Sequence, residues 1–212
     1  DPYYYLYYGK AARPPSYFTL ELEQPEVGRV VRCDSLSKVL SAGIRIAFAS
    51  GPAPIMDAID LHTSSANLQV SSLTQVIALS VLESWGYDGF IEHTKGVSHF
   101  YRQKRDAFEK AMYHHLGGLA EWSTPEAGMF FWFKLLLNDP SRPERQVEED
   151  SEELIRTKAL ENGVLALPGT SFLATGGKTA YVRASFSLLD TDAVEEALRR
   201  LREVILKARS GA

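Results

Sequence analysis

A single lysine between two strand-like runs constrains this chain more than any other feature. Residues 30–49 read V-V-R-C-D-S-L-S-K-V-L-S-A-G-I-R-I-A-F-A, so two serines closely precede Lys38 and Arg45 follows it by seven residues. The apolar runs at 28–34 and 44–50 are rich in Val and Ile, which predicts two short buried strands on either side of a turn. We therefore expect a polar pocket at the edge of a sheet, with Lys38 in it.

The residue types around Lys38 fit carbonyl chemistry. A lysine amine does covalent work when a pocket favours its reactive form and a carbonyl ligand can form a Schiff base with it. Pyridoxal phosphate is the usual carbonyl, and its phosphate needs hydroxyl donors and a planar guanidinium. Ser35, Ser37 and Arg45 offer these groups. In the alternative interpretation, Lys38 and Arg45 are solvated loop charges and the serines are turn residues.

The chain start and three later stretches point the same way. Asp1 and Tyr4 lie in D-P-Y-Y, and a pyridoxal ring needs a carboxylate at its nitrogen and a donor near its phenolic oxygen. The sequence resembles the fold type I, class I aminotransferases, in which D-P-Y-Y and S-x-S-K…R occur in this order. The stretches A-G-M-F at 127–130, L-P-G-T-S-F at 167–172 and Y-V-R-A-S-F-S at 181–187 agree with it. The tyrosine-rich opening and residues 71–90 are most similar to the aromatic amino acid, kynurenine and 2-aminoadipate aminotransferases.

This resemblance implies a cofactor site for pyridoxal 5'-phosphate. The residues implied to bind it are Asp1, Tyr4, Ser35, Ser37, Lys38 and Arg45. Lys38 would form the Schiff base, Asp1 would keep the pyridine nitrogen protonated, and Tyr4 would hydrogen-bond the ring oxygen. The two serines and the arginine would hold the phosphate.

The resemblance also implies how substrates bind. Arg183 would hold the α-carboxylate of an amino acid or a 2-oxo acid, because a guanidinium fixes a carboxylate in plane and angle. Phe130 would line the substrate side, although a buried strand residue is the plain alternative. The family active site lies at a homodimer interface, so a partner subunit is implied.

The resemblance implies an α/β fold, the C-terminal part of a fold type I transferase. Residues 1–95 would be the end of the large cofactor-binding domain, with its mixed sheet, and residues 96–212 the small α/β domain. In the family, roughly as many residues again precede the position of Asp1 and carry more of the cofactor pocket. We therefore expect this chain to be catalytically incomplete by itself.

Composition excludes several other classes of protein. The net charge is −4 and charges of both signs are mixed along the chain, so no basic stripe indicates nucleic acid. No apolar run is long enough to span a bilayer. The one cysteine, Cys33, excludes an internal disulfide framework and suits a reducing, cytoplasmic compartment.

Two rival functions are distinguishable in principle. Ser35-Leu36-Ser37-Lys38 also matches the S-x-x-K of penicillin-binding enzymes, but there the serine opens a helix, whereas here a strand-like run follows closely. Some transcription regulators carry an aminotransferase-like domain that binds the cofactor and senses a ligand without turnover. Their mark, a basic winged-helix region, would precede Asp1.

The rest of the pattern predicts helices at 54–61, 72–85, 89–116, 152–162 and 192–208, and strands at 129–137, 164–167 and 180–186. In the last helix, Asp192 and Glu195 are spaced as an N-cap and its N3 partner. His114 and His115 have no carboxylate or cysteine at ligand spacing, so we expect no metal site.

Overall fold

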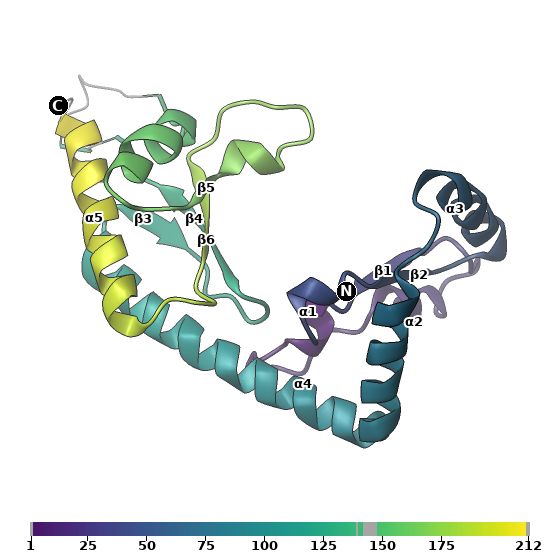
Figure 1. Cartoon of the computed structure of the whole chain (residues 1–212). Helices are drawn as coiled ribbons and strands as arrows, with labels where there is room; N and C mark the ends of the chain where they lie inside the picture. Colours follow the sequence, from purple (N-terminus) through teal and green to yellow (C-terminus); the bar gives the residue numbers. More distant parts are fainter. Residues whose placement is uncertain (1, 139, 142–147, 211–212) are drawn as a thin grey trace. The chain divides into compact units, whose positions relative to one another are not determined.

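The protein is described by a computed structural model that covers residues 2–138, 140–141 and 148–210. It divides into two compact units, residues 1–100 with 126–128 and residues 101–125 with 129–212. Helices and strands alternate along the chain, and the architecture is α/β, as predicted (Figure 1). Among the described residues, none of the helices combines the length and the apolar character needed to cross a bilayer.

The first unit contains a short antiparallel sheet and several helices. Its elements are α1 (Pro2–Tyr5), α2 (Tyr17–Glu21), β1 (Arg32–Ser35), the 3₁₀ helix η1 (Ala42–Ile44), β2 (Ala47–Ser50), α3 (Ala53–Ala66) and α4 (Ser72–Leu116) as far as Phe100. β1 pairs only with β2 among the described strands, and Ser35 lies opposite Ala47.

The expected burial holds in part for β1, where Asp34 is buried, and is wrong for β2. β2 is exposed at all four positions, and Phe48 retains 52% of its accessible surface. The apolar residues have the composition of a buried strand, but no other described strand pairs with β2 and no described helix buries its faces. A pattern of residue types shows that a strand is able to be buried. Whether it is buried depends on other segments that pack against its faces.

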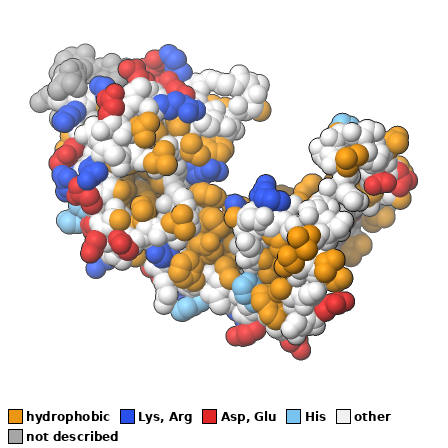
Figure 2. Space-filling view, in the orientation of Figure 1, with side chains coloured by type: hydrophobic (Ala, Val, Ile, Leu, Met, Phe, Trp, Pro, Cys, Tyr) orange, Lys and Arg blue, Asp and Glu red, His pale blue; other side chains and the backbone are white. Residues whose placement is uncertain are grey.

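The two helices expected on either side of residue 86 are present and joined. α4 bends at Gly86, whose φ of 63° and ψ of −174° are not helical. Glycine tolerates this positive φ because it has no Cβ. Apolar side chains along the first part of α4 are exposed, and Figure 2 shows hydrophobic atoms gathered there. They are Leu73, Val76, Ile77 and Leu79.

The second unit has the larger core, built on a four-stranded antiparallel sheet. Its elements after α4 are β3 (Ala120–Trp122), β4 (Phe130–Leu135), the π-helix η2 (Leu154–Ala159), β5 (Leu167–Pro168), the 3₁₀ helix η3 (Gly169–Phe172), β6 (Tyr181–Ser185) and α5 (Thr191–Ser210). The strand order is β3-β4-β6-β5. Phe131 and Phe133 alternate on β4 with more exposed neighbours and are fully buried, as period-two patterning requires.

Helices complete this core. Phe108 of α4 stacks on Phe131 with 5.2 Å between ring centroids. α5 buries a stripe that largely matches the predicted one: Val194, Leu198, Leu201, Val204 and Ile205.

Two details of the second unit differ from the sequence prediction. The N-cap of α5 is Asp190, whose Oδ1 accepts a hydrogen bond from the Ala193 backbone N–H at 2.8 Å, and not Asp192. The apolar stripe shows only roughly where the helix begins, so it did not indicate which of the two aspartates, Asp190 or Asp192, is the N-cap. β3 was not predicted, because three residues are too few to show a period.

Candidate active site

Hydrogen bonds hold the turn that carries Lys38 in place, both where the strands enter it and next to the lysine. β1 and β2 enter it as paired strands, and the Leu36 N–H donates to the Ile46 carbonyl at 3.0 Å. Val39, next to the lysine, is buried, and its carbonyl lies 2.7 Å from Nε2 of His93 on α4. His93 therefore fixes the position of the lysine turn from 54 residues away, and no local signal in the sequence indicates this role.

Ser35, Ser37 and Arg45 come together beside Lys38. The Ser37 backbone N–H donates to Ser35 Oγ at 3.2 Å, and Arg45 Nη1 donates to Ser37 Oγ at 3.3 Å. Arg45 also donates to the Ala42 carbonyl at 3.2 Å. The chain thus gathers two hydroxyls and a guanidinium within one turn and its flanks.

Arg45 has an unusual backbone conformation. Its φ of 52° and ψ of 37° lie in the left-handed region, which non-glycine residues seldom adopt. Such conformations cost about 1–3 kcal/mol and are concentrated at functional sites. In this one, the guanidinium reaches back to Ser37.

The chemistry of this cluster fits a phosphate. Hydroxyl and guanidinium groups donate to phosphate oxygens, and a neighbouring lysine adds positive charge. In the described part of the chain, neither Lys38 nor Arg45 has a carboxylate within salt-bridge distance. Their positive charge is therefore not neutralised by a described acid, and an anion is the complementary ligand.

A buried acid lies in β1, just before the turn. Asp34 is buried and accepts hydrogen bonds from Arg32 Nε at 2.6 Å and from Nη2 at 3.1 Å. Burial raises the pKa of the Asp34 carboxyl, but hydrogen bonds, including those from Arg32, outweigh it, so the pKa lies below its ordinary value. The carboxylate is therefore held in its charged form beside Ser35.

Arg183 on β6 is the predicted substrate residue in the second unit. It lies opposite Trp132 on one side and Leu167 on the other, and it is half-buried. Its guanidinium carbon is 4.3 Å from the ring centroid of Phe130 and 4.4 Å from that of Phe172. Two aromatic faces therefore hold the guanidinium.

The Arg183 guanidinium also has no described acid as a partner. No carboxylate of the described residues lies within salt-bridge distance of it. A strand arginine with a purely structural role is expected to pair with such an acid. The planar group is instead supported on aromatic faces, and it can offer two parallel N–H donors to a carboxylate.

The loop that supplies Phe172 is tethered to the helical segment before it. Thr170 donates to Glu152, Arg156 pairs with Glu152, and Arg156 Nη2 donates to Ser171 Oγ at 3.0 Å. The hydrogen bond from Thr170 and then that from Arg156 lower the pKa of Glu152. The motif at 167–172 was recognised in the sequence, but the role of Phe172 was not.

The remaining predicted residues are only partly described. Asp1 lies outside the described residues. Tyr4 belongs to α1, and its side chain is outside the described part of the structure. Nearby, Gly128 has a φ of +79°, and a Cβ there would lie 2.3 Å from the Tyr3 ring, so only glycine fits this position of the 127–130 motif.

Comparison with known proteins decides the family. The model of the family "Aminotransferase class I and II" matches residues 3–201 of this chain. The chain belongs to this aminotransferase family. The S-x-x-K rival fails on the same evidence, and Ser35 ends a strand rather than opening a helix.

Individual aminotransferases match nearly the whole chain. It is 42% identical over 207 residues to the aminotransferase tdiD of Emericella nidulans, a match that covers 97% of the chain and 46% of that protein. It is 36% identical over 206 residues to the mitochondrial kynurenine/alpha-aminoadipate aminotransferase of Mus musculus, covering 97% of the chain and 45% of the mouse protein.

A solved aminotransferase structure has the same fold. LysN, an alpha-aminoadipate aminotransferase from Thermus thermophilus solved with N-(5'-phosphopyridoxyl)-L-leucine, superposes with a TM-score of 0.84 at 31% identity. This match covers all of the chain and 50% of LysN. The chain thus spans about half the length of the aminotransferases that it matches.

Proposed function

We propose that this protein is a pyridoxal-phosphate-dependent aminotransferase that moves an amino group between an amino acid and a 2-oxo acid. The observation that supports the proposal is the cluster of Ser35, Ser37 and Arg45, whose donor groups suit a phosphate and which Lys38 adjoins in the sequence. Membership of the aminotransferase family supports it.

Each residue of the first unit has a role in this proposal. Ser35, Ser37 and Arg45 hold the phosphate of the cofactor, and Lys38 holds its aldehyde carbon. When bound, the cofactor ring supplies an electron sink for the electron pair released at the substrate α-carbon. The Lys38 amine, once free, takes the substrate α-proton and returns it as a general base and acid.

Two further contacts are assigned from the family pattern. Asp1 keeps the ring nitrogen protonated, and Tyr4 donates to the ring oxygen. Both are supported by their place in the D-P-Y-Y motif alone.

In the second unit, Arg183 binds the α-carboxylate of both substrates through two parallel hydrogen bonds. Phe130 and Phe172 fix the plane of the guanidinium, so the carboxylate plane is fixed with it. The same site then serves amino donor and oxo acid in turn, and we expect ping-pong kinetics.

We propose aromatic and 2-aminoadipate-like amino acids as donors. This rests on relatives named for kynurenine, 2-aminoadipate and aromatic amino acids. A homodimer and a cytoplasmic location are also proposed, the first from the family resemblance and the second from the presence of one cysteine, Cys33, in the sequence.

Turnover assays of the protein test the function. With pyridoxal phosphate and 2-oxoglutarate, we expect L-2-aminoadipate, L-kynurenine or L-phenylalanine to yield glutamate, and Lys38→Ala to abolish the reaction. Full turnover by Lys38→Ala would contradict the assignment of the lysine. Tight cofactor binding without turnover of any donor would favour the ligand-sensing alternative.

A further inference from the structure

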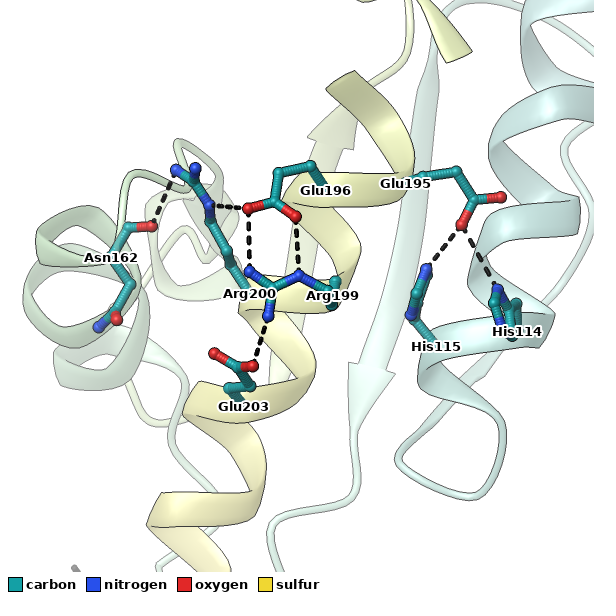
Figure 3. Close-up of polar contacts among 8 residues, drawn as sticks. All are labelled: His114, His115, Asn162, Glu195, Glu196, Arg199, Arg200 and Glu203. Atoms are coloured by element: carbon teal, nitrogen blue, oxygen red, sulfur yellow. Dashed lines mark hydrogen bonds and ion pairs between the residues drawn. The ribbon is translucent and has the colours of Figure 1, made fainter. Parts of the chain in front are cut away.

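Two adjacent histidines and a glutamate from a distant segment converge in the second unit. His114 and His115 occupy the last turn of α4, and Glu195 lies near the start of α5. Glu195 Oε2 is 2.6 Å from His115 Nε2 and 3.5 Å from His114 Nδ1, as Figure 3 shows. The two imidazole rings face the same carboxylate, with 4.3 Å between their centroids.

The separations of the three ligand atoms fit a single metal ion. One nitrogen of each histidine and one oxygen of Glu195 all lie within 4.8 Å of one another. Ligand atoms on a tetrahedral ion with bonds of 2.0–2.1 Å are about 3.4 Å apart. The side chain of His114 is 72% exposed and that of His115 is 13% exposed. The contact between Glu195 and His115 at 2.6 Å is a hydrogen bond and is shorter than the spacing of two metal ligands, so the ion would take the place of the shared proton as Glu195 moves away from His115.

The neighbouring charges leave Glu195 available to a cation. On the next residues of α5, Glu196 pairs with Arg199 and Arg200, and Glu203 pairs with Arg199. Figure 3 shows these arginines turned to those acids and Glu195 turned to the histidines.

The backbone at the end of α4 also favours a cation at this position. The C-terminal turn of α4 carries the negative end of the helix dipole, which favours a cation beside His114 and His115. Arg202 donates to the His115 carbonyl at 3.0 Å and fixes the backbone of that turn, while its own positive charge opposes the cation. The Glu195 carboxylate and the C-terminal end of α4 are the two negative groups that offset the positive charge of Arg202.

We propose that His114, His115 and Glu195 bind one divalent transition-metal ion, of which Zn²⁺ is the physiological candidate, with water completing the coordination. Imidazole nitrogens suit Zn²⁺, Cu²⁺ and Ni²⁺, whereas Ca²⁺ and Mg²⁺ take oxygen ligands. The ion links the end of α4 to the start of α5. It is thus a structural or regulatory clamp within the second unit.

The prediction from the sequence that these histidines have no metal role rested on local spacing. The third ligand comes 80 residues after His115, and only the packing of α5 brings it close. No period or motif in the sequence links the two segments.

Cobalt titration of the untagged chain tests the proposal, because Co²⁺ substitutes for Zn²⁺ and gives visible absorption bands. We expect one equivalent of Co²⁺ to bind and Zn²⁺ to displace it. His114→Gln and Glu195→Gln should each weaken binding at least tenfold, about the least that loss of a supporting residue costs at metal sites. His62→Gln, at an exposed histidine of α3, is the matched control and should bind as the parent does.

Both site variants should fold, since the side chain of His114 is exposed and glutamine keeps a hydrogen-bond acceptor for His115; circular dichroism checks this. The proposal is overturned if the parent chain binds no Co²⁺, if the two site variants bind it as tightly as the parent, or if His62→Gln loses as much affinity as they do.

Discussion

At the scale of single residues, Arg183 shows how aromatic neighbours position a charged group. Its guanidinium carbon lies over the rings of both Phe130 and Phe172, and none of the described acids pairs with it. The sequence predicted Arg183 and Phe130 from the family pattern, but it did not predict the second ring. Phe172 reaches Arg183 through the path of η3, which depends on contacts with residues 152–156.

Arg183→Lys separates a functional from a structural role. Lysine keeps the charge but loses the planar two-point contact. Losing a buried, hydrogen-bonded charge contact costs roughly 2–5 kcal/mol, so kcat/KM should fall by about 30-fold to several-thousand-fold for both amino donor and oxo acid. Single-turnover rates with each substrate measure this. Arg102→Lys, at an exposed site on α4, is the control.

Cofactor absorbance and melting temperature should be almost unchanged in Arg183→Lys, since the phosphate is assigned to Arg45. If the variant instead melts earlier and keeps parental rates with both substrates, Arg183 is a structural strand residue.

At the scale of elements, η3 depends on a titratable tether. The hydrogen bond from Thr170, followed by that from Arg156, lowers the pKa of Glu152 below its ordinary value of 4.5. A lowered carboxyl pKa stabilises the folded loop fully above about pH 4.5, and the contribution is lost as the pH falls through the folded value. We expect η3 to loosen only in this acid range.

Amide chemical shifts of Thr170 and Ser171 between pH 6 and 3.5 measure this release. The parent should show an inflection below pH 4.5, and Glu152→Gln should lack it and resemble the released loop at neutral pH. The same inflection in both proteins would assign it to another group.

The elements also show where sequence patterns reach their limit. The lysine turn was predictable because Ser35, Ser37 and Arg45 lie within eleven residues. The interruption of the helix at Gly86 was predictable because glycine separates two apolar stripes, although the two helices were expected to be separate and are joined at a kink. The hydrogen bond from His93 to Val39 could not be predicted, because the two residues are far apart in the sequence and histidine and valine occur in many other structural roles.

At the scale of the whole molecule, the first unit has little core of its own. Its described buried apolar residues are Leu6, Tyr8, Val39 and Ala78, while β2 and the first part of α4 expose apolar side chains. The chain spans about half the length of the aminotransferases that it matches.

We therefore expect the 212-residue chain by itself to associate and to bind the cofactor weakly, because exposed strand edges and apolar patches favour association. Gel filtration with light scattering measures association, and hydrogen exchange should be faster in β1 and β2 than in β4 and β6. A monodisperse, fully active monomer with protected β2 amides would contradict this.

Lys38 is the residue proposed to hold the cofactor, and covalent trapping tests this assignment directly. Borohydride fixes pyridoxal phosphate to the amine that binds it, and mass mapping of the reduced holoprotein then identifies the labelled peptide. We predict a yellow protein that is bleached on reduction, with the label on Lys38 and no yellow form in Lys38→Ala. Label on any other lysine would contradict the account.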